Sequence, residues 1–230
     1  MTQNNKILSF KIYLILATLF ITALVVSNLI FQKFFNWNPF GLYDFELSVG
    51  ILPYPITFLV TDLISEIYGK QKANKVVTAG IFASVFSLII IVVADGAPAT
   101  EWSPVDSALY HKVFGFSAIA VFSSMIAYLI AQFVDIRIYH FWKKFTKGKH
   151  LWLRNNFSTI SSQFLDTFSV LVLLCSFGVI EWTLFYKLLI NGFVFKLLIA
   201  LLDTPVLYVA VYFFRKKFDL KPGEEIELLS

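Results

Sequence analysis

The hydrophobic positions of this chain fall into long runs that short polar segments separate. A helix rises about 1.5 Å per residue and the hydrocarbon core of a bilayer is about 30 Å thick, so a spanning helix needs roughly 17 to 25 mostly apolar residues. The runs near this length are Lys11–Phe31, Ile51–Tyr68, Val76–Ala94, Val113–Ile136, Phe157–Ile180 and Leu188–Phe214. We therefore predict an all-α membrane protein with six transmembrane helices.

The second run, Ile51–Tyr68, is the shortest, and Pro53 and Pro55 stand at its start. Proline removes a backbone donor and clashes with the preceding turn, so a helix rarely continues through it undisturbed. The sequence therefore predicts a short second helix that is broken or re-entrant at its start.

Polar residues gather on one side of two of these runs when each residue is turned by about 100°. The polar half of the second run holds Thr61, Asp62, Ser65 and Glu66, and that of the fifth run holds Ser162, Gln163 and Asp166. A charge at the bilayer centre costs at least about 2.5 to 3.5 kcal/mol, so such residues usually face a protein interior or a water-filled cavity. We expect Asp62 and Asp166 near the midplane and Glu66 one turn closer to the cytoplasm.

The fourth run carries the same polar spacing as the fifth. Gln132 and Asp135 stand three residues apart in AQFVD, as Gln163 and Asp166 do in SQFLD. Five residues are too few to define a repeat, but the echo places an amide and an acid on each of two helices. Because Arg137 follows closely, Asp135 has an alternative interpretation as a residue of the inner interface.

Two opposite charges stand in the sixth run. Lys196 and Asp203 are seven residues apart and so lie on nearly one face of a helix. We predict that they form a counter-charge pair whose rearrangement accompanies gating. The alternative is that Lys196 only neutralises a buried carboxylate or extends toward the interface.

Composition supports the assignment to the membrane. Hydrophobic residues make up 58% of the 230 residues, the mean hydropathy is +0.74, and charged residues make up only 15%. Soluble domains carry roughly 25% charged residues, and a water-soluble chain of this size could not bury so much apolar surface. The single cysteine, Cys175, lies in an apolar run and allows no intrachain disulfide.

The basic residues predict the orientation. With the amino terminus in the cytoplasm, 15 of the 19 Lys and Arg residues fall in inner segments, whereas only Lys33, Lys112 and Lys187 fall in outer ones. This distribution satisfies the positive-inside rule with both termini cytoplasmic. We predict an amino-terminal segment 1–10, a membrane domain 11–214 and a cytoplasmic tail 215–230. The basic excess then anchors the chain and contacts anionic lipid head groups, so it does not indicate nucleic-acid binding.

No catalytic or metal-binding motif accompanies the polar residues. The sequence contains no H-E-x-x-H, no nucleophile elbow and no phosphate-binding loop, and its three histidines stand in or beside loops. No voltage-sensor ladder or filter-like loop indicates a channel. We therefore expect no enzyme, no metal and no cofactor. What remains is a cavity lined by acids, amides and aromatic rings, which suits a small polar, planar or cationic solute.

Three segments resemble a known family. YPITFLVTDLISEIYGKQKANKVV, LIAQFVD and LWLRNNFSTISSQFLDT are similar to the bacterial queuosine precursor transporters, also called vitamin uptake transporters. The likeness extends from about Ser27 to Tyr212. It implies a six-span inner-membrane importer of 7-cyano- or 7-aminomethyl-7-deazaguanine, which are precursors of the tRNA nucleoside queuosine.

Such a base would suit the polar residues named above. A guanine-like edge carries adjacent N–H donors for a carboxylate, and its carbonyl accepts from an amide. We assign Asp62 or Asp166 to that edge, Gln163 and Gln132 to the carbonyl side, and Glu66 to a charged substituent or a proton; Asp135 completes the candidate site. The alternative function is a binding subunit for a vitamin or purine-like solute that a separate ATPase complex energises. The sequence leaves open proton coupling and homodimer formation.

Overall fold

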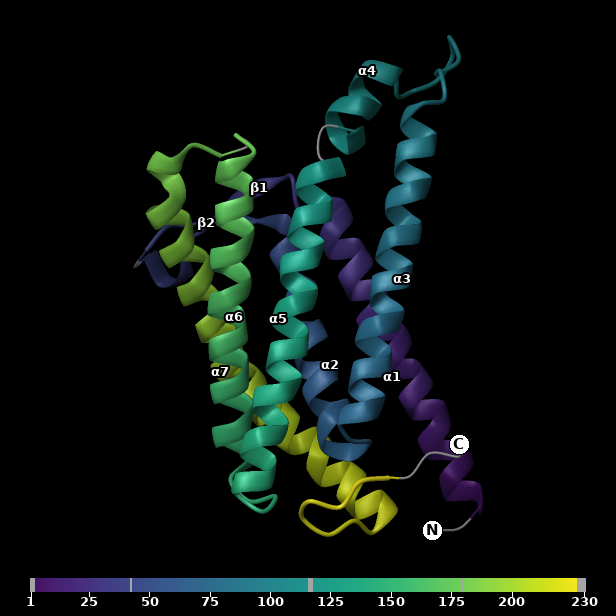
Figure 1. Ribbon diagram of the computed structural model, residues 1–230, viewed down its shortest axis with the longest axis vertical. Coiled ribbons are helices and arrows are strands. Elements are labelled where there is room, and N and C mark those ends of the chain that lie inside the picture. Colours follow the sequence, from purple (N-terminus) through teal and green to yellow (C-terminus); the bar gives the residue numbers. More distant parts are fainter. Residues whose placement is uncertain (1–2, 42, 116–117, 179, 227–230) are drawn as a thin grey trace.

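The computed structural model describes residues 3–41, 43–115, 118–178 and 180–226, and long helices run side by side through the molecule (Figure 1). The long helices are α1 (Gln3–Ile30), α2 (Tyr54–Ile67), α3 (Lys70–Asp95), α5 (Ala118–Phe145), α6 (Leu151–Ser176) and α7 (Phe185–Phe218). The short elements are β1 (Phe34–Trp37), η1 (Pro39–Gly41), β2 (Phe45–Ser48), η2 (Val49–Ile51), α4 (Ser107–Tyr110), η3 (His111–Gly115) and η4 (Trp182–Leu184).

Several of these helices have the length and hydropathy of membrane spans. Among the described residues, five segments qualify: Gln3–Ile30, Val49–Ile67, Lys70–Asp95, Leu151–Ser176 and Trp182–Phe218. The fourth predicted run, Val113–Ile136, includes residues 116–117, which lie outside the described part, and most of it corresponds to α5, a helix of 28 residues. Large apolar side chains such as Phe82, Phe86 and Phe213 point outward, as expected for a surface that faces lipid.

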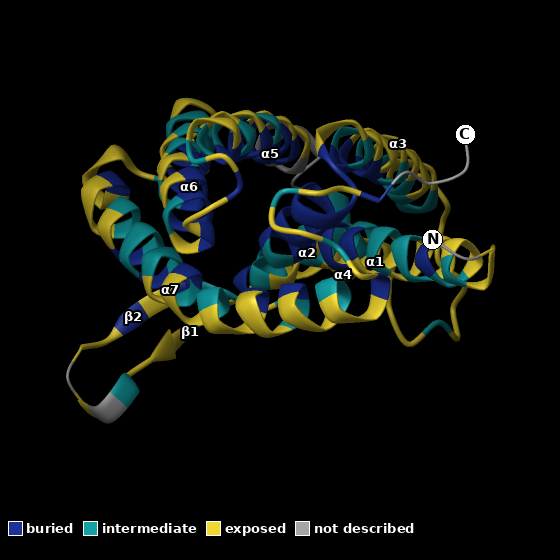
Figure 2. Cartoon of the chain, turned by 90° about the horizontal axis from the view of Figure 1, so that it is seen from below, coloured by how far each residue is buried: buried dark blue, intermediate teal, exposed yellow. Residues whose placement is uncertain are grey.

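The second span has the predicted interruption. η2 ends at Ile51, Pro53 occupies the N-cap, and α2 then runs for only 14 residues, or about 21 Å. Val49–Ile67 is also the most enclosed of these five segments, because 67% of its apolar window is buried, against at most 44% in the other four. Figure 2 shows this buried helix surrounded by its neighbours, whose outer faces are exposed. Its polar half therefore faces protein.

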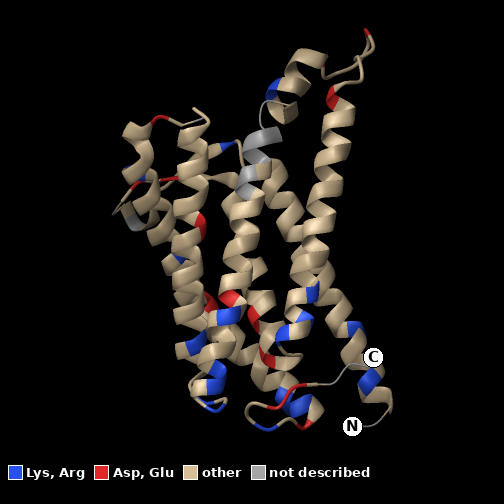
Figure 3. Ribbon diagram, in the orientation of Figure 1, with Lys and Arg blue, Asp and Glu red and all other residues tan. Residues whose placement is uncertain are grey.

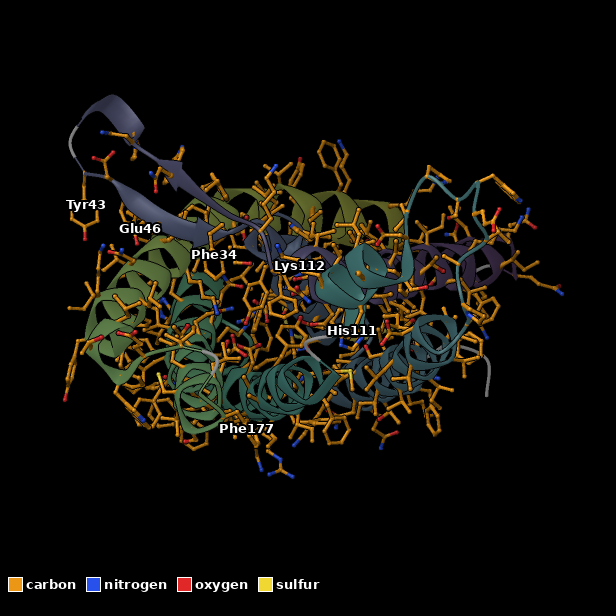
Figure 4. All side chains as sticks on the ribbon, turned by 90° about the horizontal axis from the view of Figure 1, so that it is seen from above. Phe34, Tyr43, Glu46, His111, Lys112 and Phe177 are labelled. Atoms are coloured by element: carbon orange, nitrogen blue, oxygen red, sulfur yellow. The ribbon has the colours of Figure 1, made fainter. Side chains whose placement is uncertain are left out.

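A β-hairpin, which the purely helical prediction omitted, joins α1 to η2. β1 and β2 pair antiparallel, with Phe34 opposite Ser48 and Trp37 opposite Phe45. Phe45 and Leu47 are buried while Glu46 between them is exposed, which is the alternation of a half-buried strand. Figure 4 looks down on this end of the bundle and shows Tyr43 and Glu46 at its edge, with Phe34 closer to the middle.

The end of α1 and the hairpin are held together closely. The Ser27 hydroxyl donates to the carbonyl oxygen of Gly50 over 2.5 Å. A Cβ at Gly50 would lie only 2.7 Å from the Ser27 carbonyl oxygen, so this approach requires glycine. The contact fixes η2, and with it the start of α2, against α1.

Charge is distributed unevenly along the long axis. Figure 3 shows Lys and Arg gathered toward the end of the bundle at which both the first and last described residues lie. This is the end that the sequence assigns to the cytoplasm. The helices also extend past the predicted spans here, since α3 begins at Lys70, α6 at Leu151 and α7 ends at Phe218.

Candidate functional site

A cavity of about 200 Å³ lies between the hairpin, the end of α1, the start of α2 and the upper parts of α6 and α7. Its walls are mainly aliphatic and aromatic. The polar side chains near its floor are those of Tyr54, Thr57, Tyr128, Asp166 and Lys196. A mostly apolar cavity with a few convergent polar groups has the character of a small-molecule site.

Asp166 is the acidic group at the floor. Its Oδ2 atom lies 2.6 Å from the ammonium nitrogen of Lys196 and also accepts a hydrogen bond from the Tyr54 hydroxyl. The ammonium group of Lys196 stands 4.2 Å from the centre of the Tyr54 ring, a cation–π distance. The other oxygen, Oδ1, is buried and receives no hydrogen bond from the described residues. The floor thus offers one unused acceptor beside a cation.

Aromatic rings form one wall above α2. Tyr54, Phe58 and Tyr128 have centroids 5.1 to 5.8 Å apart and pack in tilted or edge-on pairs. The Gln132 amide donates to the Tyr128 hydroxyl over 2.7 Å and accepts from Thr61 over 3.2 Å. Gln132 therefore does not line the cavity, and it orients Tyr128.

Below this floor, Asp62 of α2 faces Asp135 of α5. Thr159 donates to Asp62 Oδ2 over 3.4 Å, and Ser162 donates to Asp135 Oδ1 over 2.9 Å. Thr159 and Ser162 are one turn apart on α6, so the two carboxyl groups are neighbours, and both are buried. The remaining oxygens, Asp62 Oδ1 and Asp135 Oδ2, receive no donor from the described residues.

Glu66, one turn further along α2, lies in a different environment. The Arg154 guanidinium approaches Oε2 to 2.6 Å, Tyr139 donates to the same oxygen over 3.1 Å, and Arg215 pairs with Oε1. The side chains of both Glu66 and Arg154 are fully buried. Arg154 also donates to the carbonyl oxygens of Gly148 and Lys149, which end the α5–α6 turn.

The carboxyl-terminal segment completes this closed end. Lys143 donates to the backbone carbonyls of Ser65 and Glu66 and pairs with Glu225 over 2.8 Å. The backbone N–H of Ile226 donates to the carbonyl oxygen of Ile67 over 2.7 Å. The segment after α7 therefore passes the end of α2 and caps the carbonyl of Ile67, while Lys143 of α5 caps those of Ser65 and Glu66.

The structure distributes the predicted site residues over three levels. Asp166 reaches the cavity, and Gln163 lines a much smaller cavity beneath it with Asp203 and Lys196. Asp62 and Asp135 lie deeper, and Glu66 lies at the closed end. The pairing predicted for Lys196 needs correction: its partner is Asp166 and not Asp203. Seven residues on a helix span about 10 Å along the axis, which is too far for a direct contact between these two side chains.

The residues that pair with these acids were not predicted from the sequence. The positive-inside rule treats Lys143, Arg154 and Arg215 as cytoplasmic anchors, and the sequence pattern assigns no role to Tyr54 or Tyr139. For Arg154, a signal was present in the polar run RNN, which continues the polar face of the fifth run toward its amino-terminal side. Extending that helical face by two turns places Arg154 within the bundle, where α6 begins at Leu151.

A comparison with known protein families identifies the family of this chain. Residues 48–210 match the family described as "Putative vitamin uptake transporter", and this range holds α2 and the candidate acids Asp62, Glu66, Asp135, Asp166 and Asp203. The chain belongs to the vitamin uptake transporter family. Several apolar helices and the bacterial relatives below identify this member as a multi-pass protein of the bacterial inner membrane.

Three curated relatives of this vitamin uptake transporter are named as transporters. It is 27% identical to the "Probable queuosine precursor transporter" of Bacillus subtilis (strain 168) over 74% of this chain and 73% of that one. Identity is 27% to the protein of the same name from Haemophilus influenzae, over 55% of this chain and 51% of the relative. The "Queuosine precursor transporter" of Escherichia coli (strain K12) is 24% identical, over 56% and 55% of the two chains. No solved structure matches this chain.

Proposed function

We propose that the protein is a six-span importer of queuosine precursors, with both termini in the cytoplasm and the cavity facing the outer side of the membrane. The three relatives named for these precursors support the substrate class. The gathering of Lys and Arg at the end away from the cavity supports the orientation.

The observation that carries the proposal is the unused oxygen of Asp166. Adjacent N–H donors on the edge of a 7-deazaguanine would donate to Asp166 Oδ1, which has no other donor among the described residues. The Lys196 ammonium, 2.6 Å from the other oxygen, would face the carbonyl of the same base. In an apolar cavity these charge-assisted hydrogen bonds are stronger than in water.

The remaining candidates take supporting places in this proposal. Tyr128, held by Gln132, offers an aromatic wall for the flat base. Gln163, whose Oε1 atom is buried without a described donor, lies just beneath the floor and contacts a base that settles deeper. Glu66, enclosed by two arginines and Tyr139, belongs to the closed cytoplasmic end and does not contact the base at this stage.

The proposal is tested by uptake into cells that cannot synthesise queuosine and depend on added precursor. Asp166→Asn should lower uptake about tenfold or more, because the variant keeps the shape of the side chain but loses a charged acceptor. Asp44→Asn, an exposed acid of the hairpin, is the matched control and should transport normally. Wild-type uptake by Asp166→Asn would contradict the assignment.

Ligand specificity gives a test that needs no variant. Purified protein should bind 7-cyano-7-deazaguanine and should not bind 7-deazaadenine, whose edge presents an acceptor where the guanine type presents a donor. Equal binding of both bases would remove the role of Asp166. Uptake by the protein alone in liposomes distinguishes an importer from a binding subunit that needs a separate ATPase.

A further inference from the structure

The facing carboxyl groups of Asp62 and Asp135 have no function in the proposed binding of the base. They come from different helices, are buried, and accept hydrogen bonds from Thr159 and Ser162, which lie one turn apart on α6. Two carboxylates cannot hydrogen-bond each other without a proton, and two adjacent buried negative charges repel strongly. A single proton held between them satisfies one oxygen of each group and removes one of the two charges.

Among the described residues, the buried cations are paired with other acids and do not replace that proton. Lys196 of α7 is paired with Asp166, and Arg154 of α6 and Arg215 of α7 are paired with Glu66. The titratable groups around the pair are Asp203 of α7, Tyr54 of α2, and Tyr128 and Tyr139 of α5, none of which brings a positive charge. The remaining contacts come from the hydroxyl groups of Ser158, Thr159 and Ser162 on α6.

The other neighbours of α2 are apolar at this level. α1 and α3 contribute Phe20, Leu24, Val76 and Val77 to the core that also holds Ile64. Tyr13 of α1 stacks on Tyr68 beyond the end of α2, and the Lys70–Lys75 group of α3 lies at that same end.

A second, small cavity lies between the larger cavity and Thr159, the residue that donates to Asp62. The small cavity of about 10 Å³ beneath the floor shares Tyr54 and Lys196 with the larger one, and its lining includes Thr159, the donor to Asp62. Gln163 and Asp203 line it as well. This volume is close to that of one ordered water molecule, and the polar side chains in the lining stand among apolar ones.

Glu66 differs from Asp62 and Asp135, because both of its oxygens already have partners. Arg154, Arg215 and Tyr139 occupy both of its oxygens, and Lys143 stands 3.8 Å away. Glu66 therefore has no oxygen left for a further partner and belongs to the ion-pair cluster of the closed end.

We propose that Asp62 and Asp135 together form the proton-binding site of this transporter, and that one proton enters with each base. The proton adds to the facing carboxylates as it arrives from the outer cavity, giving one carboxyl and one carboxylate that share a hydrogen bond. It leaves to the cytoplasm when the inner end opens, which restores two carboxylates. The inference rests on the proposed import of a 7-deazaguanine.

The test uses purified full-length protein in liposomes and separates coupling from transport. Exchange of labelled for unlabelled 7-deazaguanine at equal pH needs no net proton movement, whereas accumulation against a gradient does. With the outside more acidic by one pH unit, the wild type should accumulate the base up to about tenfold. Asp62→Asn and Asp135→Asn should lose accumulation under the pH gradient by a much larger factor than they lose exchange, whereas Asp44→Asn should keep both.

The outcomes are distinguishable. No exchange by the wild type would contradict the proposed function itself. Exchange with no response to the pH gradient would leave the function standing and overturn proton coupling. Accumulation by both asparagine variants at the wild-type level would overturn the site. If an asparagine variant does not fold, Asp62→Glu and Asp135→Glu replace it, and exchange without gradient-driven accumulation in both would contradict the proposal.

Discussion

The buried acids at the two ends of the polar core differ in how many of their oxygens have a partner. Asp166 at the cavity floor keeps one oxygen without a described donor, while Glu66 at the closed end has ion pairs or hydrogen bonds at both oxygens. An unpaired buried acceptor is costly, so it is expected where a ligand completes it. A buried acid whose two oxygens both have partners is expected where the protein's own side chains close one end of the bundle. Under the proposed function, this difference assigns substrate entry to the cavity and later opening to the closed end.

Breaking the closed end should have the largest effect on stability. Arg154→Ala leaves Glu66 buried with fewer partners, and loss of one member of a buried ion pair costs about 3 to 5 kcal/mol in the free energy of unfolding. Thermal unfolding of the detergent-solubilised protein measures the loss. Arg215→Ala should cost less because its side chain is 23% exposed.

Lys144→Ala is the control for this prediction, because Lys144 is exposed at the same end of α5 and forms no ion pair among those of the described residues. It should unfold like the wild type. If Arg154→Ala and Lys144→Ala unfold at the same temperature, Glu66 does not depend on its cations and the contrast with Asp166 loses its basis.

The sequence predicted the positions of these acids better than it predicted their partners. Turning each residue by about 100° puts Asp62, Glu66 and Asp166 on the polar half of their helices, opposite an apolar half that contacts lipid or the hydrophobic core. This pattern correctly placed all three acids inside the bundle. The broken start of α2 followed from Pro53 in the same local way.

The partners of these acids were not predictable in that way. Arg215 stands 149 residues from Glu66, and Lys196 stands 30 residues from Asp166. Helical periodicity gives a direction for each side chain but not the neighbour it meets, which depends on how the helices cross. A rule that counts every Lys and Arg near a span end as an anchor also hides those that turn inward.

A smaller effect should follow from loosening the tail at the closed end. Gly69 joins α2 to α3 with a φ of +82°, and a Cβ there would collide with the carboxylate of Glu225. Gly69→Ala should therefore cost about 1 to 3 kcal/mol in backbone strain and displace the tail. Thermal unfolding measures the first effect, and the rate of protease cleavage between Asp219 and Ile226 measures the second.

Gly178→Ala separates strain from displacement. Gly178 also has a positive φ, of +71°, but a Cβ there meets nothing within 4 Å. This variant should lose some stability and leave cleavage of the tail unchanged. If both variants expose the tail equally, the contact between Gly69 and Glu225 does not hold it in place.

The smallest effect concerns a second lysine on α7. Lys187 pairs with Glu46 over 2.8 Å, nearly the distance between Lys196 and Asp166, but both partners are about half exposed. Water and salt screen an exposed pair, whereas a pair at the cavity floor is screened far less.

A double-mutant cycle with Lys187→Met and Glu46→Gln should show no measurable coupling. The cycle with Lys196→Met and Asp166→Asn should give about 0.5 to 3 kcal/mol, because each single change leaves a buried group unpaired. Equal coupling in the two cycles would mean that the cavity floor is as wet as the rim, and Asp166 would then have little advantage as a ligand for the base.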